Sequence, residues 1–284
     1  MSEHILHPEL FEQIPLTGKV IMRAIERRAS EMAAMSLAPQ DITVAVRTLN
    51  EASSLEGLLE DIDRQQTSGE VEVVVVDNDS SDRTPEVARY YGATVVSLAR
   101  RDFTYPRSMN LAMDAASHNA VFLTVGHARL SNNQLLNAGG RNLVSNRGES
   151  GGAFGHTLPN ANASIYERIQ PAVNLAFRKP THVKRAGLGV MGATSAVLDK
   201  QVWRKMGRFD ECYESGGEDT ALAAKILDAG MVIEDDPILS VHHSHGLGFI
   251  NTIKQWQHWL ETVKGPIKLD LDKLVARRPD LDVS

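Results

Sequence analysis

A β-branched apolar run that ends abruptly in an acidic loop limits how this chain can fold more than any other feature. Val71–Val76 has the composition of an interior strand of a parallel sheet, buried on both faces. Thr84 is predicted to be a helix N-cap and Pro85 a first helical residue, with Glu86 favoured by the helix dipole. This order of strand, loop and helix places the loop at the carboxyl end of a strand, where α/β sheets bind ligands.

The loop carboxylates Asp77, Asp79 and Asp82 allow two interpretations. They could accept hydrogen bonds from a base or ribose, or face a cation, as ligand-binding groups at this edge of a sheet do. Alternatively they form an Asp/Ser-rich turn whose side chains only cap backbone groups. The local pattern does not decide between the two.

Length, charge and cysteine usage narrow the class of protein. A chain of 284 residues can hold one large domain or two small ones. The net charge of -6 disfavours a general nucleic-acid binder, and the single cysteine, Cys212, excludes an internal disulfide. No apolar run approaches the roughly 20 residues of a membrane span, and the first residues lack a signal-peptide pattern. We therefore expect a cytoplasmic protein, with peripheral membrane attachment left open.

Residues 41–130 alternate predicted strands and helices. The strands cover 42–46, 71–76, 93–96 and 121–124, and helices near 55–62, 85–91 and 107–116 separate them. This order predicts the α/β class, with a central, mostly parallel, twisted sheet and helices on both faces. No G-x-G-x-x-G follows the first strand and no G-x-x-x-x-G-K-[ST] occurs, so neither a dinucleotide site nor a P-loop is supported.

The flanking regions are less regular. Residues 1–40 predict an amphipathic helix with a basic face, which could pack on the domain or a dimer partner, or lie on a membrane. Further along, a helix is expected over 218–229, a strand over 238–242, and a final amphipathic helix carrying Trp256 and Trp259. Three glycine-rich pieces predict loops near a cleft. They are Gly139-Gly140, Gly148 to Gly155, and Gly187 to Gly192.

Gly216-Gly217-Glu218-Asp219 places two adjacent carboxylates at the start of a predicted helix. The helix N-terminus stabilises their ionised forms, and a carboxylate at a cleft can act as a general base toward a hydroxyl nucleophile. Simple capping of the helix by acidic residues is the competing interpretation.

Three histidines, His242, His243 and His245, cluster at the end of a predicted strand. Side chains two residues apart on a strand share a face, so His243 and His245 could point the same way. Imidazoles bind divalent transition metals, and His127 or an aspartate could supply a third ligand. The alternative is a pair of surface histidines beside one that is buried and hydrogen-bonded.

Two other charged groups have less specific interpretations. Asp235-Asp236-Pro237 looks like a carboxylate pair, but Pro237 restricts Asp236 to an extended or turn conformation, which favours a surface turn. Arginines near the expected site could neutralise a diphosphate, or could simply be solvated charges. They are Arg47, Arg100, Arg101 and Arg107.

Two segments resemble the nucleotide-binding half of family 2 glycosyltransferases of the GT-A fold. They are Thr43–Glu51 and Val75–Thr84. Phe209-Asp210-Glu211 followed by Gly217-Glu218-Asp219 resembles the acceptor-side motif of that family, and Val241–His245 resembles the late histidine segment of its rhamnosyltransferase-like members. The matches span about residues 41–260. Each is loose by itself, but their order and spacing together are more specific to the family.

The resemblance implies a role for each matched residue. Thr48, Asn50 and Glu51 would lie along the nucleotide, with Asp77 bonded to the base, Asp79 beside it, and Arg107 near the diphosphate. Asp219, with Glu218 next to it, would be the base of an inverting displacement. His243 or His245 would contact a metal or phosphate. The chain would divide into a helical extension (1–40), a nucleotide-sugar-binding half (41–130), an acceptor-binding, catalytic half (131–248) and a helical tail (249–284).

One departure from the family concerns the metal. Its members usually carry Asp-x-Asp after the strand that corresponds to Val121–Thr124, whereas this chain continues Val125-Gly126-His127-Ala128. His127 could replace an aspartate as a nitrogen ligand, which would favour manganese over magnesium. Alternatively the enzyme needs no metal and His127, Arg107 or Arg129 supplies the charge, or catalysis has been lost.

The resemblance implies a glycosyltransferase that moves a sugar from a nucleoside diphosphate to a glycan, lipid-linked or small-molecule acceptor. A divalent cation (Mn or Mg) would serve as cofactor, and a homodimer is left open. The competing hypotheses are a non-catalytic protein of the same fold and a nucleotidyltransferase. Residues 47–53 lack the Gly-rich, basic loop of the latter class.

Overall fold

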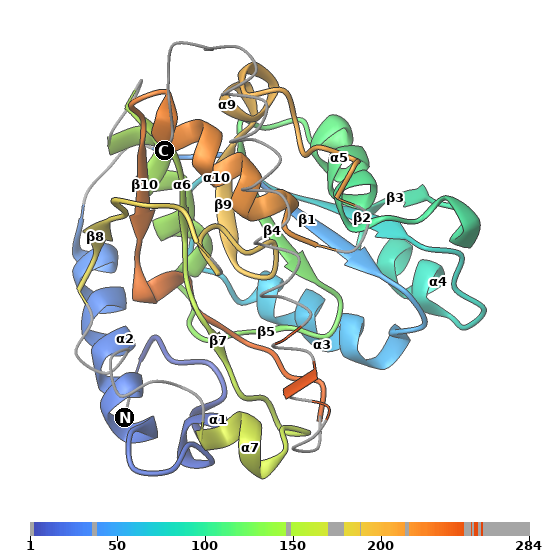
Figure 1. Ribbon diagram of the computed structural model, residues 1–284. Helices are drawn as coiled ribbons and strands as arrows, with labels where there is room; N and C mark the ends of the chain where they lie inside the picture. Colours follow the sequence, from blue (N-terminus) through green and yellow to red (C-terminus); the bar gives the residue numbers. More distant parts are fainter. Residues whose placement is uncertain are drawn as a thin grey trace.

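The computed structural model shows an eight-stranded sheet that runs through both halves of the chain (Figure 1). The structure describes residues 3–35, 39–145, 149–169, 179–187, 189–213 and 216–246, with 251, 253, 254 and 257. In spatial order the strands are β3 (Thr94–Ser97), β2 (Val71–Asp77), β1 (Ile42–Thr48), β4 (Ala120–Val125), β9 (Ala196–Asp199), β6 (Ser150–Phe154), β10 (Val232–Asp235) and β8 (Thr181–His182). The predicted tail helix with Trp256 and Trp259 lies outside the described residues.

The first four strands of this order are parallel, as the βαβ pattern predicted. Successive valines of β2 enter different cores, Val75 on one face of the sheet and Val74 and Val76 on the other. A strand with two buried faces has no solvent side, which explains the continuous apolar run Val73–Val76. The second half adds β9, antiparallel to β4 and β6, and then β10, parallel to β6. The sheet is therefore mixed but mostly parallel.

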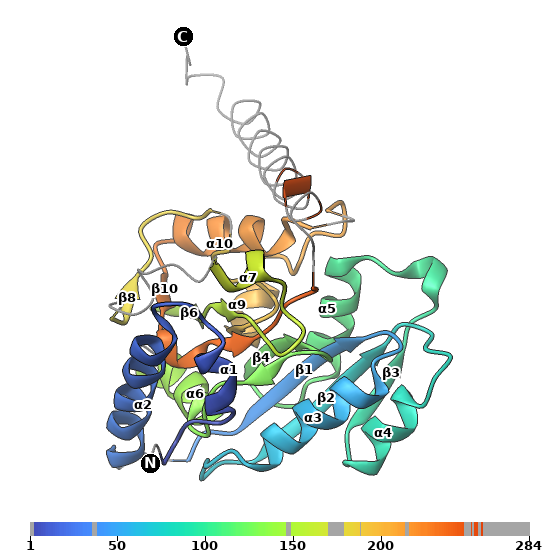
Figure 2. The same cartoon turned by 90° about the horizontal axis from the view of Figure 1, so that it is seen from below.

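Helices cover both faces of the sheet (Figure 2). One face packs against α2 (Gly18–Ala34), α3 (Ala52–Asp63), α4 (Thr84–Tyr90) and α6 (Leu135–Ser145), and the other against α5 (Tyr105–Ala115), α9 (Lys200–Lys205) and α10 (Glu218–Asp228). The short helical elements are α1 (Pro8–Glu12), α7 (Ile165–Ile169), and the 3₁₀ turns η1 (Arg100–Asp102) and η2 (Pro237–Leu239). A second, three-stranded sheet has the order β5 (Arg129–Leu130), β11 (Val241–His242) and β7 (Thr157–Leu158). Within the described ranges, no helix combines the length and apolar character that crossing a bilayer would require.

The amphipathic helix expected within residues 1–40 packs on the domain. Ala29 and Met32 of α2 join the core beside β1 and α3, while Ile21 and Ile25 pack with Phe11 and Leu158. Burial at every fourth residue or so is what an apolar stripe of helical period produces. The basic face of the helix also contacts the domain, since Arg28 Nη2 donates to Asp236 at 3.1 Å.

Asp235 and Asp236 are not in a surface turn, so that prediction was wrong. Asp235 is 2% exposed and Asp236 0% exposed. Asp235 ends β10 and meets His156 Nε2 at 2.7 Å, while Asp236 caps η2 and receives Arg28. Paired and hydrogen-bonded carboxylates can be buried at this point, whereas unpaired ones could not. The strand expected over 238–242 is correspondingly shorter, because η2 precedes β11 (Val241–His242).

Two of the glycine pieces lie in regular elements, contrary to the expectation of loops. Gly139 and Gly140 belong to α6, where an added Cβ on Gly140 would lie 2.9 Å from Gln40 Cβ. Gly151 and Gly152 belong to β6, and a Cβ there would meet Ile226 at 2.5 Å or Met191 at 2.7 Å. These glycines therefore allow close packing of helix and sheet, a role that composition does not distinguish from a loop.

Candidate functional site

The parallel strands bring the expected donor residues to one edge of the sheet. Thr48 ends β1 and pairs in register with Asp77, which ends β2. Asp77 is 5% exposed; its Oδ2 accepts from Ser80 N at 3.1 Å, while Oδ1 has no hydrogen-bond partner among the described residues. A buried carboxylate oxygen without a partner is costly, and a ligand that donates an N–H would remove that cost.

The loops beside Asp77 hold one another through side chain to backbone bonds. Asn50 has a positive φ of 53°, and its Oδ1 accepts from Ser81 N at 2.8 Å. Asp82 accepts from Thr84 N at 3.0 Å and from Ala52 N at 3.2 Å, so for Asp82 the capping interpretation holds. Thr84 itself is the first residue of α4, with Arg83 as N-cap, and not the cap as predicted. Asp79 is exposed in the same loop, with a φ of 60°.

The three expected histidines meet at this edge. His127 follows β4, and His243 and His245 follow β11. One ring nitrogen from each of the three lies within 4.8 Å of the others. His127 Nε2 and His243 Nε2 are 2.9 Å apart, and the rings of His243 and His245 lie 4.6 Å apart between centroids. His242 points elsewhere, with Nδ1 bonded to the Pro159 carbonyl at 2.8 Å.

Burial favours the neutral forms of two of the three imidazoles, those of His243 and His245. Burial, reinforced by the nearby His127 and His245, lowers the pKa of His243 to about 2. Burial also lowers the pKa of His245. Neutral imidazoles have a free lone pair, which is the form that binds metal ions.

Glu51 is the contact that sequence reasoning missed in this cluster. Its Oε1 lies 2.5 Å from His127 Nδ1, and its Oε2 accepts from Thr48 Oγ1 at 2.9 Å. Glu51 and Thr48 therefore hold His127 in addition to lining the donor edge. The signal was available, because parallel strands β1 and β4 must end at the same edge.

The acid pair lies at the first turn of α10, with Gly217 as N-cap at a φ of 99°. Glu218 is 4% exposed and Asp219 is partly exposed; Asp219 Oδ1 accepts from Thr220 N at 2.6 Å. Burial, with the charge of Asp219 beside it, raises the pKa of Glu218 to about 7, and burial also raises the pKa of Asp219. Capping alone does not require burial of both carboxyls, and Glu218 Oε2 has no partner in the described chain.

Arg47 lies near both the acid pair and the histidines. Its charge opposes the rise in the pKa of Glu218 and Asp219 and helps to lower the pKa of His243. The guanidinium stands over the ring of Tyr105, 4.5 Å from its centroid. The part of the chain that the structure describes offers it no carboxylate within 4.0 Å, which leaves the charge available to an anion.

The other arginines are placed less favourably than Arg47 for binding a diphosphate. Arg107 is exposed in the first turn of α5, and Arg100 and Arg101 are exposed in η1. Arg129 binds Asp61 through Nε at 2.7 Å and through Nη2 at 2.9 Å. Arg129 is therefore committed to a structural ion pair and does not supply charge to a ligand.

Replacing Gly126 by alanine should disturb this site more than its size suggests. An added Cβ would lie 2.4 Å from Glu51 Oε2 and 2.8 Å from Thr48 Oγ1, so Glu51 would have to leave His127. We expect a loss of about 1–3 kcal/mol in the free energy of unfolding, as for other overpacked sites. Urea denaturation measures it, with Gly187→Ala as control because a Cβ there meets nothing within 4 Å. Equal stability of both variants would contradict the crowding.

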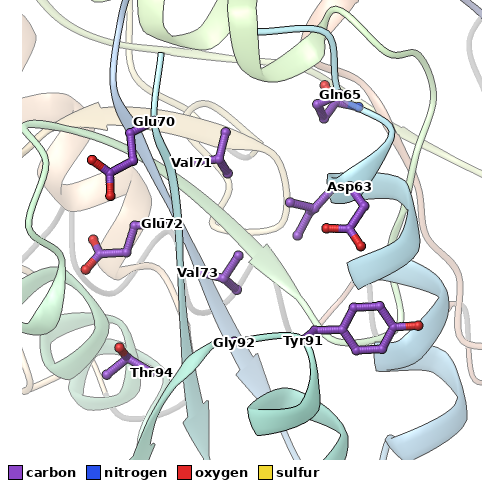
Figure 3. Close-up of a pocket in the computed structure, with 10 residues that line it drawn as sticks. Asp63, Gln65, Glu70, Val71, Glu72, Val73, Tyr91, Gly92 and Thr94 are labelled. Atoms are coloured by element: carbon purple, nitrogen blue, oxygen red, sulfur yellow. The ribbon is translucent and has the colours of Figure 1, made fainter. Parts of the chain in front are cut away.

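A hollow at the end of the sheet opposite to the candidate site does not suit a nucleoside diphosphate (Figure 3). It lies beside the first residues of β2, and Tyr91, Gly92 and Thr94 complete its wall. Asp63, Glu70 and Glu72 also line it. Three carboxylates would repel phosphates, so the carboxyl end of the sheet is the better site.

Comparison with known proteins agrees with this placement. Residues 43–128 match the family model of Glycosyl transferase family 2. A dolichyl-phosphate hexose transferase of Haloferax volcanii is 42% identical over 76 residues, which are 27% of this chain and 30% of that protein. The O-antigen chain rhamnosyltransferase WbaN of Salmonella anatum is 24% identical over 192 residues, or 64% of this chain and 59% of that protein. The chain thus spans less than two thirds of either relative.

Solved structures share the fold. The mannosyltransferase PcManGT from Pyrobaculum calidifontis, in complex with GDP-Man and Mn²⁺, superposes with a TM-score of 0.59 at 19% identity, covering 93% of this chain and 76% of that one. TarS 1-349 of S. aureus, in complex with UDP-GlcNAc, gives 0.56 at 15% identity, over 74% of this chain and 59% of that one. The expected fold is confirmed: this is the α/β fold of GT-A glycosyltransferases. The match to family 2 covers residues 43–128, the part of the chain that contains the four parallel strands.

Proposed function

We propose that this protein is a glycosyltransferase that moves a sugar from a nucleoside diphosphate to an acceptor hydroxyl, with inversion. One observation carries the proposal: an acid pair and a cluster of three histidines both lie near Arg47, which meets no carboxylate among the described residues, at the sheet edge where Asp77 ends β2. A base, a cationic centre and a nucleotide-binding carboxylate are the parts that such a transfer needs.

The donor would lie along the ends of β1 and β2. Asp77 Oδ1 would accept the imide N–H of a base, which fits uracil, thymine and guanine. Thr48, Asn50, Glu51 and Asp79 form the surrounding loops, and Arg107 lies at their border on α5. Arg47 is better placed than Arg107 to bind the diphosphate, because Arg47 lies near both the acid pair and the histidine cluster.

The transfer itself would begin at Asp219. Its carboxylate takes the proton of the acceptor hydroxyl, whose oxygen attacks the anomeric carbon while the bond to the diphosphate oxygen breaks on the opposite side. Burial raises the pKa of both carboxyls, so the pair holds a proton near neutral pH, and loss of that proton leaves a carboxylate that can act as the base. The charge that develops on the leaving group meets Arg47. A divalent cation at His127, His243 and His245 would supply additional positive charge there.

The acceptor belongs to the carbohydrate or lipid-linked class in this proposal. The name of the Haloferax volcanii relative points to a lipid phosphate, and that of WbaN points to a polysaccharide chain. A non-catalytic, nucleotide-sugar-binding protein is the second candidate, because no carboxylate follows β4 where the family usually has Asp-x-Asp.

Nucleotide binding tests the donor half of the proposal. We expect one of UDP, GDP and dTDP to raise the thermal midpoint, since a ligand at 100 times its dissociation constant adds about 2.7 kcal/mol. Asp77→Asn should weaken that nucleotide about 10- to 100-fold, because the amide N–H replaces the acceptor that the base needs. Asp63→Ala is the control, since it removes an exposed carboxylate at the other end of the sheet. If no nucleotide stabilises the protein, the proposed donor site is wrong.

A further inference from the structure

The donor set at the histidine cluster differs from what a magnesium-type cation requires. Mg²⁺, Ca²⁺ and Mn²⁺ prefer carboxylate, carbonyl and water oxygens, whereas imidazoles suit zinc, copper, iron and nickel. The ring nitrogens that converge here are those of His127, His243 and His245. Glu51 turns its oxygens to His127 Nδ1 and to Thr48, and Glu167 Oε1 accepts from the backbone N of His245 at 2.8 Å. An oxygen-preferring ion therefore does not fit this set of ligands.

The arrangement around His127 is that of an oriented metal ligand. His127 Nδ1 lies 2.5 Å from Glu51 Oε1, and its other ring nitrogen, Nε2, is turned toward His243. A carboxylate behind a ligating histidine fixes its tautomer and increases its basicity. Two Nε2 atoms 2.9 Å apart can share a proton, or can move apart slightly to hold one ion.

Three imidazoles and an open side resemble a catalytic zinc site in ligand number. Three protein ligands leave a further position for water or for a ligand oxygen. His245 is exposed and His243 is partly exposed, so the cluster opens toward solvent while Glu51 closes it from behind. The missing side chain of Gly126 leaves the room that Glu51 occupies.

We propose that His127, His243 and His245 bind a late first-row transition metal such as Zn²⁺, Co²⁺ or Ni²⁺ in preference to Mg²⁺, with Glu51 as the positioning residue of His127. Mn²⁺ binds more weakly in this series, because nitrogen sites follow the order Mn < Fe < Co < Ni < Cu > Zn. The inference concerns the cation of the site proposed above and rests on it for the role of the ion. Binding of the ion alone is measurable without nucleotide or sugar, so the two proposals can fail separately.

The experiment uses the full chain without a polyhistidine tag, cleared of metal by a chelator and titrated with Co²⁺, Zn²⁺ or Mg²⁺ alone. We expect one equivalent of Co²⁺ to bind with visible d–d absorption, Zn²⁺ to displace it, and Mg²⁺ to bind at least 100-fold more weakly by calorimetry. His127→Ala and His243→Ala should each weaken Co²⁺ at least 100-fold. Glu51→Gln should weaken it about 10- to 100-fold, as for other partners of metal-bound histidines.

Exposed His182 on β8 provides the matched control, because His182→Ala removes an imidazole without touching the cluster. Circular dichroism of each variant shows whether it is folded, and Glu51→Gln changes the cluster least if an alanine variant unfolds. Binding that survives in His127→Ala, or that disappears in His182→Ala, would put the ion elsewhere and overturn the proposal. So would Mg²⁺ that competes equally with Co²⁺, or no binding of Co²⁺ and Zn²⁺ at all, since the cluster would then be held by hydrogen bonds alone.

Discussion

Replacing Asp219 by asparagine should lower kcat about 10²- to 10⁴-fold, the range typical of a lost general base. The amide has nearly the same shape and can still accept from Thr220 N, so nucleotide binding and the thermal midpoint should change little. Steady-state sugar transfer and the nucleotide-induced shift in midpoint measure the two effects. Asp228→Asn, an exposed change at the other end of α10, is the control.

The pH dependence of transfer provides a second test of the acid pair. Because burial and the charge of Asp219 raise the pKa of Glu218 to about 7, activity should rise as the pH passes from 6 to 8 and the pair loses protons. Glu218→Gln removes the carboxyl that titrates near pH 7, so the acidic limb should move away from that pH. Transfer at the wild-type rate by Asp219→Asn would exclude the assigned base. Nucleotide binding without any transfer by the wild type would favour the non-catalytic alternative.

The largest effect on stability is expected at Asp61, which is 0% exposed. Its carboxylate binds Arg129, receives Leu130 N at 3.1 Å and meets His7 Nε2 at 2.8 Å. Removing one partner of a buried ion pair costs about 3–5 kcal/mol, because the other charge is left without compensation. Asp61→Ala should therefore lower the free energy of unfolding by about that amount in urea denaturation. Exposed Asp63, two residues on, provides the control as Asp63→Ala.

The stability contributed by Asp61 should depend on pH in a defined direction. Burial alone would raise its pKa, but hydrogen bonds from Arg129 and His7 hold the pKa below its usual range. The stabilisation is therefore complete above the unfolded pKa of about 3.9 and is lost as the pH falls through the folded pKa. The difference between Asp61→Ala and the wild type should persist at pH 7 and shrink below about pH 4. A difference that is independent of pH would mean that packing, not charge, explains the loss.

The same network connects the N-terminal segment with the site. His7 lies near the N-terminus, just before α1, and Arg129 lies two positions after His127. Asp61→Ala should consequently weaken Co²⁺ binding as well as stability, whereas Asp63→Ala should affect neither. His7, the residue before α1, is thus linked through Asp61 to Arg129.

The sequence by itself determined the elements whose signals are local. The run of valines in Val71–Val76 predicted a strand buried on both faces, and the loop and helix signals that follow placed Asp77 at its carboxyl end. Gly217 and the acidic pair predicted the start of α10 within one residue. The spacing of His243 and His245 predicted that they share a face, as their rings do. Each of these depends on neighbours within a few positions, where strand and helix periods apply.

Only the tertiary structure decided which charged groups meet. Arg28 and Asp236 are separated by 208 positions, His127 and Glu51 by 76, and Arg129 and Asp61 by 68. No local pattern distinguishes a solvated charge from one that receives such a partner, which is why Asp236 was assigned to the surface and Arg129 stayed one of three candidates for the charge at the site. Burial of a charge is favourable only when the fold brings its partner within hydrogen-bonding distance, and that distance is set by the packing of strands and helices far apart in the chain.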